Sequence, residues 1–178
     1  MAPRQPLPRA WLVTDERQGD RLLPAVGRLP FGSGILFRHY SLPPDQRLAL
    51  FLDIRRLARR RGHLLLVAGS AALSKRWGAD GWHGWGRGSG LHSISVHSLA
   101  EIRAAERAGA SLLFLSPVFS TRSHPGQQGI GLGAFARLSH RTDLPVIALG
   151  GVDRERAGKV MGLGAYGWAA VDAWTRES

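Results

Sequence analysis

The 178-residue sequence predicts a small (β/α)8-type barrel, because eight short apolar segments alternate with amphipathic segments along it. Several of the apolar segments are continuous runs, such as residues 112–115, which is typical of parallel strands buried on both faces. Paired glycines, Gly150 and Gly151, follow the seventh segment, where barrels of this kind commonly bind phosphate. An open, doubly wound parallel sheet is the alternative fold.

The individual elements follow from this alternation. The expected strands are residues 11–14, 34–38, 64–68, 81–83, 93–96, 112–115, 146–149 and 167–171. The expected helices are residues 44–61, 70–77, 99–108, 134–140 and 154–162. Ser98 is expected to cap the N-terminus of the helix at residues 99–108, and Asp153 that of the helix at residues 154–162. Gly78, Gly109 and Gly164 are expected to end helices in the left-handed conformation.

The barrel is predicted to be short, because barrels of this type usually need about 250 residues. A glycine-rich segment, Gly84–Gly90, stands where the helix after the fourth strand would lie, and only six residues follow Asp172. We therefore expect reduced helices after strands 4 and 8. The missing last helix is expected to expose apolar barrel wall near Trp168, Ala170 and Trp174, and such a patch predicts a homodimer.

Composition limits the class of protein. The length favours one domain over residues 1–178, with residues 1–9 as a flexible tail. Cysteine is absent, which excludes disulfides and thiolate chemistry. No apolar run reaches the 18 or so residues that a membrane span needs, and the Pro- and Arg-rich start does not resemble a secretory signal. The cytoplasm is the expected compartment, and a membrane partner is not expected.

The net charge of +11 has two interpretations. It could attract an anionic partner, or it could reflect a general preference for arginine. The densest basic run, Arg55–Arg61, also has apolar residues at helical spacing, so a solvated helix face is favoured over a binding patch. A nucleic-acid-associated protein is therefore a minor hypothesis, because the chain has no recognised nucleic-acid motif, and no specific nucleic acid is expected.

Candidate ligand groups follow several expected strands. Arg38 ends the second strand, where its guanidinium could bind phosphate. Ser95 and its neighbours at the end of the fifth strand could donate or accept a hydrogen bond. A long polar loop after the sixth strand could enclose an anion with hydroxyl, backbone and cationic groups. The groups of that loop are Thr121, Arg122, Ser123 and His124.

Six short motifs, taken in order, are similar to those of one family. They occupy residues 12–15, 78–83, 95–98, 116–121, 145–151 and 164–167. On these motifs the chain resembles the thiamine-phosphate synthase/TenI family from about residue 10 to 174, most strongly from Ser93 onward. The resemblance implies a TIM barrel and the synthase reaction, in which hydroxymethylpyrimidine diphosphate loses pyrophosphate and thiazole phosphate captures the pyrimidine methylene. The product is thiamine phosphate.

The resemblance also implies roles for single residues. Arg38 corresponds to a diphosphate-binding arginine and Ser95 to a serine that contacts the pyrimidine. Thr121 and Ser123 correspond to a pair at the thiazole phosphate. His124 stands where the family has a lysine. The remaining phosphate-binding positions, reached through backbone groups, are Gly150, Gly151, Val171 and Asp172.

The chain departs from the family at the implied metal site. The family uses Mg²⁺, but the positions of its carboxylate ligands are occupied here by Ala68, Gly69 and Gly88. The sequence therefore shows no metal ligand and no evident cofactor. Two interpretations stay open: a synthase-like transferase that acts on a phosphorylated substrate, and a non-catalytic binder of a phosphorylated thiazole-like metabolite.

Overall fold

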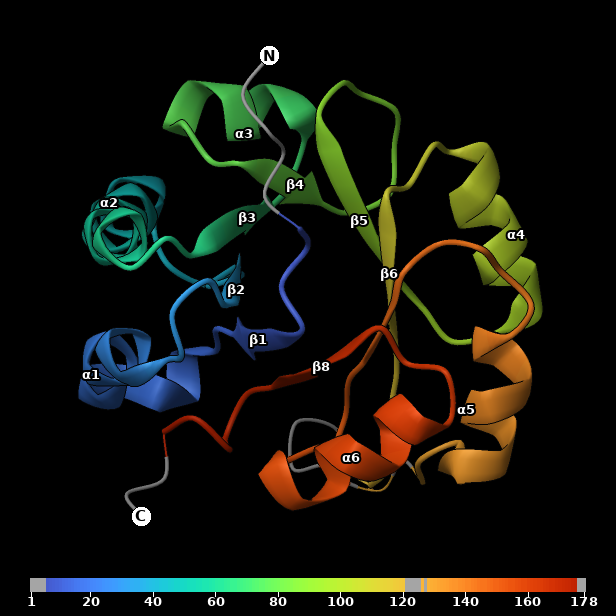
Figure 1. Cartoon of the computed structure of the whole chain (residues 1–178). Helices are drawn as coiled ribbons and strands as arrows, with labels where there is room; N and C mark the ends of the chain where they lie inside the picture. The colour runs from blue at the N-terminus through green and yellow to red at the C-terminus, as the bar shows by residue number, and fades with distance from the viewer. Residues whose placement is uncertain (1–5, 121–125, 127, 176–178) are drawn as a thin grey trace.

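The protein forms a closed barrel of eight parallel strands in strict sequence order, seen in a computed structural model that describes residues 6–120, 126 and 128–175 (Figure 1). The strands are β1 (Ala10–Val13), β2 (Gly34–Phe37), β3 (Leu64–Ala68), β4 (Gly81–His83), β5 (Leu91–Val96), β6 (Leu112–Leu115), β7 (Val146–Ala148) and β8 (Gly167–Ala170). β1 pairs with both β2 and β8, which closes the barrel. The predicted TIM-barrel fold is confirmed, and the open sheet is excluded.

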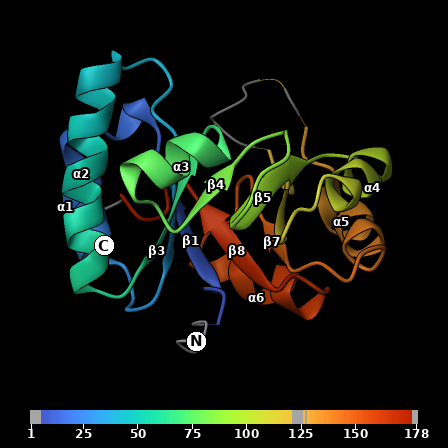
Figure 2. The same ribbon diagram turned by 90° about the horizontal axis from the view of Figure 1, so that it is seen from above.

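Helices surround the barrel (Figures 1 and 2). They are α1 (Leu22–Arg28), α2 (Pro44–Arg60), α3 (Ala71–Trp77), α4 (Leu99–Arg107), α5 (Gly131–Ser139) and α6 (Arg154–Gly162), with a 3-10 helix η1 (Glu16–Arg21) before α1. The hydroxyl of Ser98 and the carboxylate of Asp153 cap α4 and α6, as expected. Gly78 ends α3 in the left-handed conformation, with φ 67°.

Side chains alternate between the inside and the outside of the barrel, and this alternation creates two apolar cores. Trp11 and Val13 of β1 point inward, and the Trp11 ring meets that of Phe114 edge-on with centroids 5.4 Å apart. Leu12 between them points outward, into the layer covered by the helices. A Cβ atom at Gly34 would collide with the Trp11 ring, so glycine on β2 makes room for tryptophan inside a narrow barrel.

The alternation of apolar and amphipathic segments does not predict η1 or α1. α1 is only seven residues long and contains Pro24 and Gly27, which obscure the helical pattern. Pro24 lies in the first turn, where its missing N–H costs no hydrogen bond. Asp15 begins η1 with a capping box, because its carboxylate accepts from the chain and Gln18 bonds back to the Asp15 N–H.

The chain from Gly84 to Gly90 forms no helix, as expected, and it packs directly on the outside of β4. The Trp82 ring stacks on the His92 ring with centroids 3.6 Å apart, and His92 Nε2 lies 2.8 Å from the Gly84 carbonyl oxygen. A Cβ atom at Gly88 would collide with Ala71 and would lie 3.2 Å from the Trp82 ring. Gly88 therefore allows this segment to lie directly against Ala71 and Trp82.

The expectation of exposed barrel wall after β8 is wrong. Trp168, Ala170 and Trp174 are all buried, and the two tryptophan rings stack with centroids 4.8 Å apart. Trp174 Nε1 donates to the Trp11 carbonyl oxygen at 2.9 Å. One aromatic side chain thus covers the wall in place of a helix. The homodimer stays a prediction, without the apolar patch that motivated it.

Residues 7–9, expected to belong to a flexible tail, contact the N-terminal end of the barrel (Figure 2). The Tyr166 hydroxyl donates to the Leu7 carbonyl oxygen at 2.8 Å, and Trp168 N–H donates to the Arg9 carbonyl oxygen at 2.8 Å. The Arg9 guanidinium lies over the Tyr166 ring. This part of the tail is therefore fixed to the barrel.

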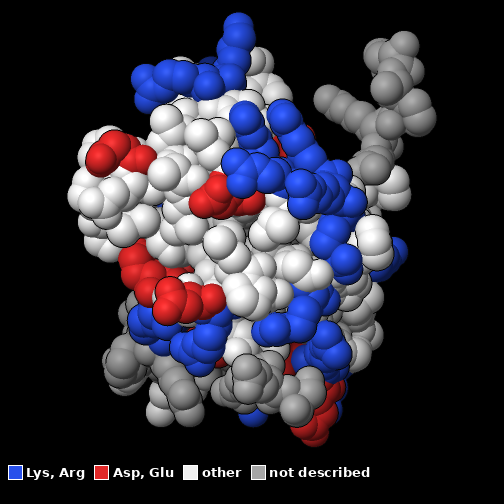
Figure 3. Space-filling model, turned by 90° about the vertical axis from the view of Figure 1, so that its left-hand side faces the viewer, with Lys and Arg blue, Asp and Glu red and all other residues white. Residues whose placement is uncertain are grey.

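Basic side chains gather on the face formed by α1 and α2, with acidic side chains among them (Figure 3). α2 buries Phe51, Ile54 and Ala58 and turns the predicted Arg55–Arg61 run outward. Part of this charge is structural, because Arg55 donates to the Trp77 carbonyl oxygen and Arg61 to that of Leu29.

Among the described residues no helix has the length and apolar character that crossing a membrane requires.

Candidate functional site

Inward-facing polar side chains line the mouth of the barrel, at the carboxyl ends of its strands. They are Arg38 directly after β2, His83 at the end of β4, and Ser93 and Ser95 of β5. In barrels of this kind the active site lies at this end. The structure therefore brings together Arg38 and Ser95, which the sequence predicts as site residues, and adds His83.

His83 is held by two serine hydroxyls. Its Nδ1 lies 2.8 Å from Ser93 Oγ and its Nε2 lies 3.1 Å from Ser95 Oγ. The Ser93 hydroxyl donates to the Trp82 carbonyl oxygen at 3.4 Å, so its oxygen is free to accept from Nδ1–H. Nε2 is then the acceptor and the Ser95 hydroxyl donates to it. This arrangement leaves the lone pairs of Ser95 for a hydrogen-bond donor on a ligand.

The imidazole of His83 is neutral. Burial, followed by the positive charge of Arg38 and the proximity of His92, lowers its pKa to about 3. A neutral ring beside a permanently charged guanidinium avoids repulsion between two cations. Arg38 is thus the positive charge that the described part of the mouth presents next to His83 and the serines.

The backbone around Arg38 is fixed from two sides. Its N–H donates to Thr14 Oγ1 at 2.9 Å. Its carbonyl oxygen accepts from Arg47 Nε at 3.0 Å and from Arg47 Nη2 at 2.8 Å, and the same Nη2 donates to the Ala68 carbonyl oxygen at 2.7 Å. Arg47 therefore ties the ends of β2 and β3 together, which positions Arg38 at the mouth.

Gly150 and Gly151 lie immediately after β7, as predicted, and both need glycine. Their φ angles are 98° and 62°. A Cβ atom at Gly150 would lie 2.6 Å from Pro117 Cα, and one at Gly151 would lie 2.6 Å from the Ser120 carbonyl oxygen. Their carbonyl oxygens accept from Phe119 N–H and from Arg156. Neither glycine N–H donates a hydrogen bond to another described residue.

Val171 and Asp172 lie after β8 beside η1. The Val171 carbonyl oxygen accepts from Gln18 Nε2 at 2.9 Å, so this group is already bonded within the protein. The Asp172 carboxylate lies 4.0 Å from Arg17 Nη2. Arg17 also pairs with Asp15 at 2.7 Å. Burial alone would raise the pKa of Asp15, but hydrogen bonds from Arg17 and the charges of Arg17 and Arg38 lower it.

The polar loop after β6 carries the other predicted site residues. Thr121, Arg122, Ser123 and His124 lie outside the described residues. His97, directly after β5, has its Nδ1 2.7 Å from the Ser116 carbonyl oxygen at the start of the loop.

His83 is the site residue that sequence reasoning missed. Its signal was its place as the final residue of an expected strand, with the inward orientation set by strand alternation. Histidine in that place has many structural roles, so its pairing with the serines of β5 emerges only when the two strands are in register.

The residues described at the mouth do not fit a protein-bound Mg²⁺. Ala68 and Gly69 have no side-chain oxygen, and the Ala68 carbonyl oxygen accepts from Arg47. Gly88 packs against Ala71, on the outer side of β4. Within residues 6–120, 126 and 128–175 no group of three or more His, Cys, Asp or Glu side chains could hold a metal ion. The donors at the mouth are instead guanidinium, imidazole and hydroxyl groups.

Fold and mouth together define a (β/α)8 barrel with basic, imidazole and hydroxyl groups at the carboxyl ends of its strands. Comparison with known proteins names the family. The thiamine monophosphate synthase family matches residues 91–174. The chain is 30% identical over 178 residues to the thiamine-phosphate synthase of Methylococcus capsulatus, covering 91% of this chain and 79% of that protein. It is 29% identical over 180 residues to the putative thiamine-phosphate synthase 2 of Aquifex aeolicus, covering 93% and 96%.

The protein belongs to the thiamine-phosphate synthase/TenI family. A solved structure agrees on the fold: the thiamine phosphate pyrophosphorylase of Pyrococcus furiosus superimposes with a TM-score of 0.79. The two chains are 24% identical, and the match covers 95% of this chain and 88% of that one. The family match begins close to Ser93, where the sequence resemblance is strongest.

Proposed function

We propose that the barrel mouth catalyses the thiamine-phosphate synthase reaction, which joins hydroxymethylpyrimidine diphosphate and thiazole phosphate and releases pyrophosphate. The observation that carries this proposal is the set of Arg38, His83 and Ser95 at the mouth of a barrel that belongs to this family. The arrangement offers a fixed positive charge for a phosphorylated substrate and an oriented acceptor for an amino group.

Each substrate has a proposed place. Arg38 binds the diphosphate, because a guanidinium forms paired, charge-assisted hydrogen bonds with phosphate oxygens. The lone pairs of Ser95, oriented by its hydrogen bond to His83 Nε2, accept from the amino group of the pyrimidine. The phosphate of the thiazole lies over Gly150 and Gly151. Their N–H groups donate to no other described residue, and they precede the N-terminus of α6.

The oxygens of departing pyrophosphate gain negative charge, so the reaction needs positive groups close to them. Arginine is proposed to supply this positive charge, from Arg38 with Arg122, because the described mouth lacks the carboxylates of a Mg²⁺ site. Turnover without Mg²⁺ should therefore be weak but measurable. We propose the cytoplasm as the compartment, where the other enzymes of a biosynthetic reaction of this kind work.

The test is turnover of the two substrates by the purified protein, with and without Mg²⁺, followed as thiamine phosphate formed. Arg38→Gln should reduce kcat/KM at least tenfold, since it removes a charge-assisted contact with the leaving group. Arg56→Gln is the matched control, because Arg56 is exposed on α2 and pairs with Asp53. It should leave kcat/KM unchanged.

Two results would overturn this proposal. One is tight binding of thiazole phosphate with no turnover under any condition, which would identify a non-catalytic binder. The other is equal turnover by wild type and Arg38→Gln. Strong dependence on Mg²⁺ would leave the reaction in place and contradict the proposed role of arginine.

A further inference from the structure

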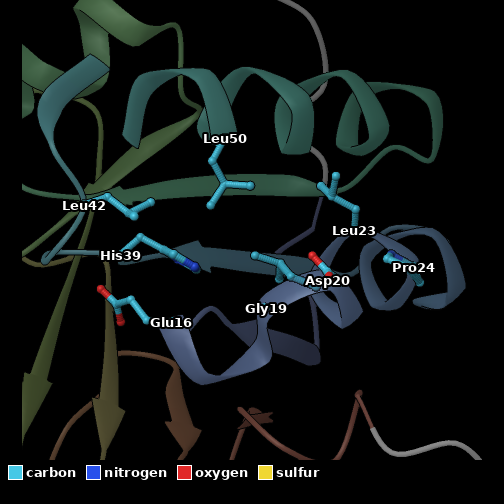
Figure 4. A pocket seen from close by; sticks show the side chains of 9 residues that line it. Glu16, Gly19, Asp20, Leu23, Pro24, His39, Leu42 and Leu50 are labelled. Atoms are coloured by element: carbon cyan, nitrogen blue, oxygen red, sulfur yellow. The ribbon is translucent and has the colours of Figure 1, made fainter. Parts of the chain in front are cut away.

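A cavity of about 440 Å³ lies outside the barrel, between the η1–α1 segment and α2 (Figure 4). Most of its wall is apolar, and Leu23, Leu42 and Leu50 contribute to it from α1, the β2–α2 connection and α2. Three polar side chains also line it: Glu16, Asp20 and His39. The cavity has no residue in common with the set of Arg38, His83, Ser93 and Ser95, although His39 directly follows Arg38.

His39 points one ring nitrogen into this cavity (Figure 4). The side chain is 5% exposed, and its backbone has φ 42°, which is unusual for a residue other than glycine. Its Nδ1 lies 2.9 Å from Thr14 Oγ1. In the described part of the chain, Nε2 has no hydrogen-bond partner. A side chain that is buried except toward a cavity, and that turns an unpartnered ring nitrogen into that cavity from a strained backbone conformation, indicates a place for a ligand.

The proton on His39 can be assigned from Thr14. The fully buried Thr14 oxygen accepts the Arg38 N–H, and its hydroxyl proton needs an acceptor. His39 Nδ1 is the acceptor within reach, so Nε2 carries the ring proton and donates into the cavity. Burial lowers the pKa of His39. The negative charges of Glu16 and Asp15 oppose this change, and the positive charges of Arg47 and Arg38 add to it. The ring is therefore neutral at neutral pH.

The other polar groups of the cavity are carboxylates. Glu16 Oε1 accepts from Ser41 N–H at 3.1 Å and from Ser41 Oγ at 2.8 Å, which fixes its position. Hydrogen bonds from Ser41 keep the pKa of Glu16 low even though burial opposes this, so the group is charged. Asp20 is a second carboxylate, and no Lys or Arg is among the described lining residues. Negative charge of this kind repels anions.

We propose that this cavity binds a small amphipathic alcohol, neutral or cationic, that is distinct from the phosphorylated substrates of the mouth. The apolar body lies against the leucines. The hydroxyl oxygen accepts from His39 Nε2–H, and the hydroxyl proton is donated to the Glu16 carboxylate. A hydroxyl is the simplest group that satisfies an imidazole donor and a carboxylate acceptor together. Anionic analogues are excluded by Glu16 and Asp20.

The experiment uses benzyl alcohol and benzoate, which share one ring and differ in the charge of the head group. Methyl and amide NMR spectra of the full chain are titrated with each compound, without substrates, so the result is independent of the proposed synthase activity. Benzyl alcohol should give saturable shifts and contacts to the methyl groups of Leu23 and Leu50, with Kd on the order of 1 mM. Benzoate should bind at least tenfold more weakly.

Variants test the location and the charge selectivity. Leu50→Trp fills the cavity and should abolish the benzyl alcohol shifts, whereas Ala49→Trp adds the same side chain at an exposed neighbouring position and should retain them. Glu16→Gln keeps an oxygen for Ser41 but removes the charge, so the preference for benzyl alcohol over benzoate should fall about fivefold. Equal binding of the two probes to wild type would overturn the proposal. NMR contacts between the probe and residues other than Leu23 and Leu50 would also overturn it, and this result is obtained with the wild-type protein alone.

Discussion

Acid should destabilise this protein through His83 in particular. The imidazole is neutral in the folded state down to a pKa of about 3, because it is buried beside Arg38. In the unfolded chain a histidine titrates near 6.5. Below pH 6.5 the unfolded state therefore takes up a proton that the folded state does not, and the free energy of unfolding falls with falling pH. The contribution of His83 is fully present above pH 6.5 and is lost between 6.5 and 3.

The size of the effect follows from the two pKa values. Between pH 7 and pH 4.5 the unfolded imidazole becomes almost fully charged while the folded one stays neutral. The linkage relation gives a loss of about 2 to 3 kcal/mol over that interval. His39 and His63, whose pKa values are also lowered by burial, titrate in the same direction. The effect of His83 must therefore be measured as a difference.

Urea unfolding of wild type and His83→Gln at pH 7 and pH 4.5 provides that difference. Glutamine can still bond to Ser93 and Ser95 but cannot be charged. The variant is expected to start less stable at pH 7 and to lose about 2 to 3 kcal/mol less than wild type on acidification. Parallel loss of stability in the two proteins would refute the reasoning, because it would mean that His83 becomes charged within the fold.

Four further variants test packing and backbone geometry by urea or thermal unfolding. Gly150→Ala should destabilise by about 2 kcal/mol or more, because φ is 98° and the new Cβ is crowded, whereas Gly158→Ala, with open space around its Cβ in α6, should stabilise by about 0.5 to 1 kcal/mol. Trp174→Ala should cost about 3 to 5 kcal/mol and should weaken the near-UV signal of its stack with Trp168. Arg47→Lys, which loses the forked contact at the end of β2, should cost about 1 to 2 kcal/mol. An unchanged free energy of unfolding in Gly150→Ala, Trp174→Ala or Arg47→Lys would contradict the contact assigned to that residue.

Apolar runs were sufficient to predict the barrel. The segment 112–115 and its counterparts appear as β-strands at the predicted places, since a strand buried on both faces leaves a distinct pattern. The paired glycines after β7 were also visible, because close packing and positive φ leave few other choices of residue. Arg38 and Ser95 were found through their places at strand ends and through the family resemblance.

The features that the sequence did not reveal depend on contacts between distant residues. α1 is short and contains proline and glycine, so its burial against α2 rather than its own pattern makes it a helix. The pairing of His83 with Ser95 requires the register of β4 on β5. The burial of Trp174 could not be inferred from a chain segment that lacks helical character, because its partners are Trp168 and the carbonyl group of Trp11.

The stack of Trp174 on Trp168 has a consequence for the order in which the protein is assembled. The pairing of β1 with β8 joins residues more than 150 positions apart, and Trp174 Nε1 donates a hydrogen bond to the Trp11 carbonyl oxygen beside it. On a ribosome β1 is made first and must wait for its second neighbour until nearly all described elements have emerged. A nascent chain stopped before β8 would have one unpaired edge on β1, and a chain stopped between residues 170 and 174 would leave Trp168 of β8 without its stacking partner. Closure of the barrel by β1 and β8 is therefore a late event of synthesis, and the cover that Trp174 gives to the outside of β8 is added later still.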